Sequence, residues 1–132
     1  MEKKRILIVD DEPDIVKTTK YLLESEGYEV FSADSGEDGL EKLKEVRPNL
    51  VLLDLRLPDM SGFQMTTKMR SIDEYKNIPV IVISGMDDLV SKHIAAKHET
   101  LGFITKPIDT ERLKHYIKDL LGEQKKGNRA RK

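Results

Sequence analysis

The strongest constraint on the fold of this chain is a set of three unbroken apolar runs, each of which ends at a polar residue. The runs cover residues 6–9, 50–53 and 80–83, and the residues that end them are Asp10, Asp54 and Ser84. Continuous apolar runs of this length are typical of parallel strands that are buried on both faces. The carboxyl ends of parallel strands share one edge of a sheet, so we expect these three polar residues to lie near one another.

Amphipathic segments with helical spacing lie between the apolar runs. Pro13 stands near the start of the first segment and Gly27 follows its end, while Ser35 is placed to cap the second. The five expected helices fall within residues 15–23, 35–46, 62–72, 88–98 and 109–121, and two further strands are expected at residues 28–33 and 103–105. Strand and helix therefore alternate five times. This alternation predicts an α/β fold, a doubly wound five-stranded parallel sheet with five helices and right-handed crossovers.

Length and composition set further bounds. A chain of 132 residues, 38% of them hydrophobic and 36% charged, suits one compact domain with a charged surface. The chain has no cysteine, which excludes disulfides, thiolate metal sites and thiol catalysis. No apolar stretch approaches the roughly 20 residues that span a bilayer, and the charged N-terminus is followed by too short an apolar run for a secretory signal. We therefore expect a cytoplasmic protein without a membrane segment.

The charge of the chain is unevenly distributed. Residues 122–132 carry five basic side chains and one acidic side chain, a net charge of +4, whereas residues 1–121 carry a net charge of −5. We therefore expect one domain over residues 1–121 and a basic tail, or the start of a linker, over residues 122–132. The tail has no aromatic residue and no groove-reading element, so nucleic-acid binding is not expected of this chain.

Three carboxylates are expected to converge at the carboxyl edge of the predicted sheet. Asp10 and Asp11 follow the first strand and Asp54 ends the third. Two unit charges about 4 Å apart repel by about 4 kcal/mol at an effective dielectric constant near 20. A hard divalent cation relieves such repulsion, and Mg²⁺ prefers oxygen ligands. Two adjacent acids alone would fit an ordinary surface loop equally well, but the third acid at a strand end favours a magnesium site.

Lys106 and Ser84 are the other candidate site residues. Lys106 follows the weak last strand and precedes Pro107, and a cis bond to that proline would aim the lysine at the acidic edge. A cation beside the acids can stabilise charge that develops on a phosphoryl group. Taken alone, Lys106 fits a solvated surface lysine and Ser84 fits a turn residue at the end of a strand.

Several short motifs, taken in chain order, resemble one known family. They are Asp10-Asp11-Glu12-Pro13 after an apolar run, the stretch Asp-Leu-Arg-Leu-Pro-Asp-Met-Ser-Gly at residues 54–62, Ser84-Gly85, and Lys106-Pro107. Each motif is weak alone, but their order and spacing resemble the receiver domain of two-component response regulators over roughly residues 4–121. The resemblance implies a flavodoxin-like sheet with the strand order 2-1-3-4-5.

The resemblance also implies a role for each site residue. Asp54 matches the phosphoryl acceptor, and Lys106 and Ser84 match the residues that contact the phosphoryl group. Mg²⁺ is the implied cofactor, and its implied ligands are Asp10, Asp11, Asp54 and the backbone carbonyl of Arg56. Ser84 and Phe103 match the hydroxyl and the aromatic ring that move on activation, although Phe103 also fits an ordinary core aromatic residue.

The implied function is acceptance of a phosphoryl group onto Asp54 from the phosphohistidine of a histidine kinase or phosphotransfer protein. Such a phosphorelay module catalyses only its own phosphorylation and dephosphorylation and is not a turnover enzyme. The chain fits a stand-alone receiver that signals through a downstream protein, or the receiver of a longer regulator with an output domain. A small α/β enzyme, such as a phosphatase or a flavin protein, is a third alternative. Against it, no Gly-rich phosphate loop follows the first strand, and Arg56 stands where an aspartyl phosphatase needs a second Asp.

Overall fold

The computed structural model describes residues 2–85 and 101–122, which form one layered α/β unit. Its strands are β1 (Arg5–Val9), β2 (Glu29–Ala33), β3 (Leu50–Asp54), β4 (Val80–Ser84) and β5 (Leu101–Thr105). Its helices are α1 (Pro13–Ser25), α2 (Gly36–Val46), α3 (Gly62–Arg70) and α5 (Thr110–Leu121). The helix expected at residues 88–98 lies outside the described residues.

The five strands form one parallel sheet with the order β2-β1-β3-β4-β5. This result confirms the predicted sheet and its strand order. From β1, the chain places β2 on one side in the sheet and β3, β4 and β5 on the other, so the strand order reverses between the neighbours β1 and β3. In doubly wound sheets, ligands bind outside the carboxyl ends of the strands at such a switch point.

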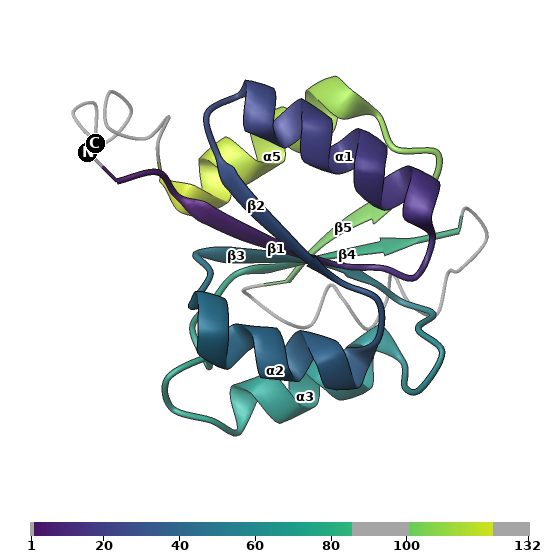
Figure 1. Cartoon of the computed structure of the whole chain (residues 1–132), viewed down its shortest axis with the longest axis vertical. Coiled ribbons are helices and arrows are strands. Elements are labelled where there is room, and N and C mark those ends of the chain that lie inside the picture. The colour runs from purple at the N-terminus through teal and green to yellow at the C-terminus, as the bar shows by residue number, and fades with distance from the viewer. Residues whose placement is uncertain (1, 86–100, 123–132) are drawn as a thin grey trace.

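Helices cover both faces of the sheet, with α1 and α5 on one face and α2 and α3 on the other (Figure 1). Successive side chains of each strand point to opposite faces, so one apolar run supplies both halves of the core. In β1, Ile6 and Ile8 pack on the α1 and α5 side, and Leu7 and Val9 pack on the α2 and α3 side. This double burial explains why the strands are continuous apolar runs rather than alternating ones.

The helix ends follow the sequence signals. Pro13 is the first residue of α1, and the Ser35 hydroxyl accepts a hydrogen bond from the Asp38 amide at 3.0 Å. Asp109 caps α5 in the same manner, and Gly122 ends that helix with a left-handed φ of 77°. The predicted end of α3 at residue 72 is wrong by two residues, because the chain turns after Arg70.

The fifth strand is longer than the sequence predicted. It begins at Leu101 rather than at Phe103, because Leu101 and Gly102 pair with Val80 and Ile81 of β4. This pairing joins residues that are far apart in the chain and leaves no local signal in the sequence. The second strand is one residue shorter than predicted, because the amide of Tyr28 still bonds to the Leu23 carbonyl at the end of α1.

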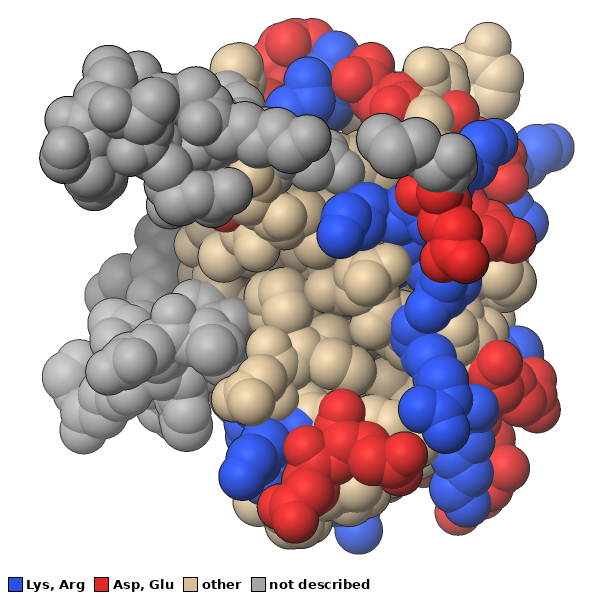
Figure 2. All heavy atoms as spheres, turned by 90° about the vertical axis from the view of Figure 1, so that its left-hand side faces the viewer, with Lys and Arg blue, Asp and Glu red and all other residues tan. Residues whose placement is uncertain are grey.

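The edge at which the strands begin lies opposite the edge that carries the candidate site. Lys and Arg side chains form a column across this face, with acidic side chains beside it (Figure 2). Arg5 donates hydrogen bonds to the carbonyls of Val46 and Arg47, and so satisfies the carboxyl end of α2. Among the described residues, no helix is long and apolar enough to cross a membrane.

We predict that Leu52→Ala lowers the free energy of unfolding by about 2–5 kcal/mol, because Leu52 is fully buried in the central strand and its loss leaves a cavity. Urea unfolding followed by circular dichroism measures this change. Tyr21→Ala is the control, since its side chain is 77% exposed and its loss should change stability by less than about 0.5 kcal/mol. Equal losses in the two variants would contradict the assigned core.

Candidate functional site

Two nearly buried aspartates lie side by side at the carboxyl edge of the sheet. Asp10 directly follows β1 and Asp54 ends β3, and the two strands pair so that Val9 faces Leu53. Asp10 is 3% exposed and Asp54 is 5% exposed. Carboxylates are rarely buried to this degree without a partner, so this pair needs a cation or a proton nearby.

A third carboxylate, that of Glu12, completes an acidic cluster with Asp10 and Asp54. One oxygen of each of the three side chains lies within 4.8 Å of the others. The carboxylates predicted from the sequence were Asp10, Asp11 and Asp54, and Glu12 was named only as part of the motif after the first strand. In the structure, Asp11 is exposed and lines the adjoining pocket. The uninterrupted acidic run Asp10-Asp11-Glu12 was the signal that could have identified Glu12.

The acidic cluster borders a pocket of about 420 Å³ at the end of the sheet. The residues that line this pocket are Asp11, Glu12, Asp54, Arg56, Ser84, Gly85 and Lys106. They come from the segments that follow four strands, namely β1, β3, β4 and β5. The structure therefore brings together, at one pocket, the predicted acceptor, the lysine, the serine and the arginine.

Lys106 provides the cation of the site. Its ammonium lies 2.6 Å from the Glu12 carboxylate and 3.5 Å from the Asp54 carboxylate. Burial alone would lower the pKa of Lys106, but the hydrogen bond to Glu12 and the charges of Asp54 and Asp10 raise it above its usual value. The Lys106 amide donates to the Ser84 carbonyl at 2.7 Å, and the peptide bond to Pro107 is cis. Lys106 is thus a fixed part of the site and not a solvated surface lysine.

Backbone amides orient both buried aspartates. The Glu12 amide donates to Asp10 Oδ1 at 2.9 Å, and the Arg56 amide donates to Asp54 Oδ1 at 3.1 Å. Each aspartate therefore accepts from the residue two positions later, which is the geometry of an Asx turn. The second oxygen of Asp54, Oδ2, faces Lys106. These two hydrogen bonds fix the orientation of the Asp10 and Asp54 carboxylates, which could otherwise rotate.

Burial is the largest influence on the protonation of Asp10. Burial and the nearby charge of Asp54 raise the pKa of Asp10, whereas the hydrogen bond from the Glu12 amide and the charge of Lys106 lower it. The net result is a pKa of about 6 in place of 3.8. The charged form of Asp10 is therefore disfavoured when only protein groups surround it. A bound cation would reverse this preference, because it interacts only with the charged form.

Ser84 and Phe103 lie on the same face of the sheet. Ser84 is 2% exposed, pairs with Thr105 and reaches the pocket, while Phe103 pairs with Val82 two residues earlier. Phe103 is half-buried against the core on the α2 and α3 side and is not among the residues that line the pocket. The structure thus places the predicted switch hydroxyl at the site and the predicted switch aromatic beside it in the sheet.

Tyr116 of α5 is a contact that the sequence analysis missed. Its hydroxyl accepts a hydrogen bond from the Phe103 amide at 3.2 Å, and its ring covers Gly102. A Cβ atom on Gly102 would lie 2.5 Å from the end of that side chain, so a larger residue there would require Tyr116 to move.

The family model for the response regulator receiver domain matches residues 6–118. The chain belongs to the response regulator receiver family. The match covers the five strands except Arg5, and all the residues of the site, and it agrees with the sheet order and with the buried aspartate pair.

Curated relatives of this receiver include short and long proteins. It is 34% identical over 117 residues to protein PilH of Pseudomonas aeruginosa, a match that covers 89% of this chain and 97% of PilH. It is also 34% identical over 116 residues to the transcriptional regulatory protein GlrR of Escherichia coli, where the match covers 88% of this chain and 26% of GlrR. The receiver therefore resembles both a protein of its own length and the receiver portion of a larger one.

A solved structure agrees with this receiver in fold as well as in sequence. The CheY-like receiver domain protein of Methanospirillum hungatei superposes with a TM-score of 0.83 at 36% identity. The alignment covers 96% of this chain and 99% of the other. The arrangement of strands and helices is therefore that of a CheY-like receiver.

We predict that Asp10→Asn stabilises the metal-free receiver by on the order of 2 kcal/mol near neutral pH. The native state holds the Asp10 proton up to a pKa of about 6, whereas the unfolded chain releases it near 3.8. Between these values the native state binds more protons, so the contribution of Asp10 to stability falls as pH rises.

The measurement is urea unfolding of the wild type and of Asp10→Asn in the presence of a chelator, across a pH series. The stabilisation should be absent below a pH of about 4, grow between about 4 and 6, and keep its full size above about 6. A difference between the two proteins that does not depend on pH would contradict burial of a charged Asp10 as its cause.

Proposed function

We propose that this receiver accepts a phosphoryl group on the carboxylate of Asp54. The single observation that carries the proposal is the nearly buried Asp54 carboxylate, which ends β3 beside Asp10 and lies 3.5 Å from the Lys106 ammonium. A carboxylate becomes a competent nucleophile when nearby cations neutralise the charges around it. The pocket of about 420 Å³ beside Asp54 offers space for the incoming group.

The donor set at this edge fits Mg²⁺. All the candidate ligands are oxygen atoms, and the carboxylates of Asp10, Glu12 and Asp54 already converge within 4.8 Å. Mg²⁺ prefers one or two carboxylates together with water and phosphate oxygens. We propose Asp10 and Asp54 as its ligands, with Asp11 and the carbonyl of Arg56 next to them. When bound, the ion neutralises charge on the transferring phosphoryl oxygens.

The transfer step requires little from the protein besides orientation and charge. An oxygen of Asp54 attacks phosphorus while the bond from phosphorus to the donor imidazole nitrogen breaks, and the imidazole leaves as the neutral base after taking up a proton. Lys106 stabilises the negative charge of the phosphoryl oxygens. Ser84 supplies a hydroxyl donor from the end of β4. The product is an aspartyl phosphate on Asp54.

Phosphorylation is proposed to act as a conformational switch through Ser84 and Phe103. A phosphoryl group brings nearly two negative charges and three acceptor oxygens to the pocket that Ser84 lines. Movement of the Ser84 hydroxyl toward these oxygens frees space on the face of the sheet that Phe103 shares. Phe103 is linked through its amide to Tyr116, so a shift of β5 reaches α5. The surface that includes α5 would then bind a downstream protein.

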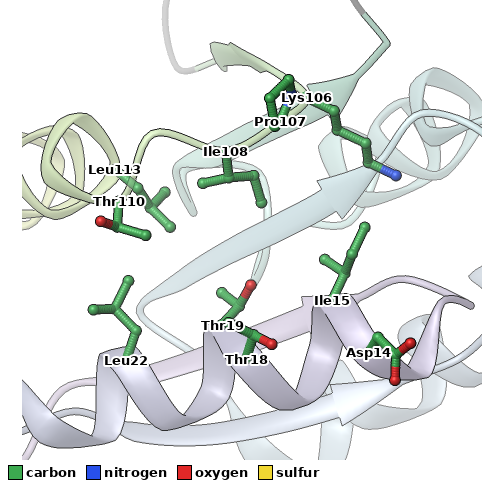
Figure 3. A pocket seen from close by; sticks show the side chains of 10 residues that line it. All are labelled: Asp14, Ile15, Thr18, Thr19, Leu22, Lys106, Pro107, Ile108, Thr110 and Leu113. Atoms are coloured by element: carbon green, nitrogen blue, oxygen red, sulfur yellow. The ribbon is translucent and has the colours of Figure 1, made fainter.

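The natural phosphodonor is proposed to be a phosphohistidine on a histidine kinase or phosphotransfer protein. A groove of about 310 Å³ lies between α1 and the start of α5, and Lys106 lies at its edge (Figure 3). Ile15 and Leu22 of α1 face Ile108 and Leu113 across this groove. A protein that delivers a phosphoryl group to Asp54 must approach this edge, where the apolar groove gives it a place to dock.

The receiver is therefore a signalling module, whose chemistry is proposed to be limited to its own phosphorylation and dephosphorylation. We propose that it spans residues 1–121 and that residues 122–132 form a basic tail or the start of a linker. The supporting observation is the end of α5 at Leu121, followed by Gly122 in a left-handed conformation.

Incubation with acetyl phosphate and Mg²⁺ should add one phosphoryl group to the native chain, as measured by mass spectrometry. Asp54→Ala should remove the addition, because Asp54 is the proposed nucleophile. Asp34→Ala is the control, since Asp34 is exposed and lies outside the residues that line the pocket beside Asp54. Equal labelling of wild type and Asp54→Ala would refute the proposal.

We predict that Ile15→Ala slows phosphoryl transfer from a phosphohistidine protein donor by about tenfold, because it removes apolar contact area from the α1–α5 groove. The reaction with acetyl phosphate should keep its rate, because a small donor does not use the groove. Rapid-quench kinetics with both donors measures the two rates. Equal slowing with both donors would show that Ile15 affects the site itself and not docking.

A further inference from the structure

The loop between β3 and α3 covers residues 55–61; it follows Asp54, the last residue of β3, and Arg56 is its second residue. The two ends of this loop lie close together. The Gly62 amide donates to the Leu55 carbonyl at 2.7 Å, and Arg56 and Ser61 form an isolated antiparallel β-bridge. A Cβ atom on Gly62 would lie 2.7 Å from the Asp54 carbonyl oxygen, so only glycine permits this closure. The base of the loop is therefore fixed by the sheet and by α3.

The tip of the same loop is attached to a different element, the amino end of α2. Asp59 accepts the Gly36 amide at 2.8 Å on one carboxylate oxygen and the Glu37 amide at 2.9 Å on the other. The Met60 side chain packs against Gly36, where an added Cβ atom would lie 2.5 Å from Met60 Cγ. These contacts join residues that are more than 20 positions apart in the chain.

The amino end of α2 has two separate caps. Ser35 satisfies the Asp38 amide from within the helix segment itself, whereas Asp59 satisfies the two preceding amides from across the loop. Helix amino ends favour anions, because the unpaired amides carry partial positive charge. In agreement, the hydrogen bonds from Gly36 and Glu37 lower the pKa of Asp59, so the contact persists in its charged form at neutral pH.

We propose that Asp59 is a positioning residue, which holds the β3–α3 loop against α2 and thereby keeps Asp54 and Arg56 in the geometry that binds Mg²⁺. This inference rests on the proposed function, because it assigns Asp59 a task at the same site. Asp59 itself lies outside the pocket beside Asp54 and acts only through the loop. Without the contact of Asp59 with α2, called the tether below, the part of the loop beyond its closed base must be ordered each time the ion binds, which weakens binding.

The tether also couples Mg²⁺ binding at the site to the amino end of α2. If the contact of Asp59 with α2 favours the loop geometry that binds Mg²⁺, then Mg²⁺ must strengthen that contact by the same factor. The amides of Gly36 and Glu37 should therefore exchange more slowly with solvent when Mg²⁺ is present. If Asp59 only capped α2, the exchange rates of these two amides would be the same with and without Mg²⁺.

The test compares wild type with Asp59→Ala, Asp59→Asn and Ser35→Ala. Ser35→Ala is a matched control, since it removes a cap from the same helix end without contacting the loop. Mg²⁺ affinity is measured by calorimetry, the free energy of unfolding by urea titration, and amide exchange by NMR. Asp59→Ala should bind Mg²⁺ about fivefold more weakly than Ser35→Ala at similar stability. Asp59→Asn keeps an acceptor oxygen and should lie between wild type and Asp59→Ala.

The exchange measurement completes the test. Mg²⁺ should slow exchange at Gly36 and Glu37 in wild type and in Ser35→Ala, and should have no effect there in Asp59→Ala. Should Asp59→Ala not fold, Asp59→Asn supplies the same comparison. Equal Mg²⁺ affinities in the Asp59 and Ser35 variants would overturn the inference and leave the proposed function intact. Absence of Mg²⁺ binding by the wild type would overturn both.

Discussion

Repulsion between carboxylates at the carboxyl edge of the sheet is the interaction on which the rest of this structure depends. Asp10, Glu12 and Asp54 have oxygens within 4.8 Å of one another, and two of the three residues are nearly buried. Lys106 is the cation that the protein itself sets against them. The excess of negative charge favours the binding of a further cation at this edge, because Lys106 carries only one positive charge against three carboxylates.

The fold makes this unfavourable arrangement possible. Five parallel strands, buried on both faces by four described helices, hold the ends of β1, β3 and β4 in fixed register. Burial of the apolar runs supplies the stability that the charged edge reduces. The loops after the strands then orient the side chains of the site. Two Asx turns orient the carboxylates of Asp10 and Asp54, and the contact of Asp59 with α2 holds the loop that follows Asp54.

The sequence predicted the features that depend on local pattern, and it missed those that depend on contacts across the chain. Apolar runs and capping residues were enough for the parallel sheet, the helix ends at Ser35 and Gly122, and the shared edge of Asp54 and Ser84, whereas the place of Lys106 at the same pocket was predicted from the family resemblance. The approach of the exposed Glu12 carboxylate to Asp10 and Asp54, the contact between Tyr116 and Phe103, and the contact of Asp59 with α2 arise from tertiary packing. No periodicity or spacing encodes such pairings, so only the folded structure reveals them.

The most direct test of the acidic edge as a magnesium site is a titration with Mg²⁺ followed by two-dimensional NMR of the backbone amides. The account predicts saturable shift changes centred on the amides of the pocket residues that follow Asp10, Asp54 and Ser84 by one or two positions, namely Asp11, Glu12, Arg56 and Gly85. Shift changes that grow linearly without saturation and are spread over the exposed acidic residues of all the helices would contradict it, because they would indicate only general screening of surface charge.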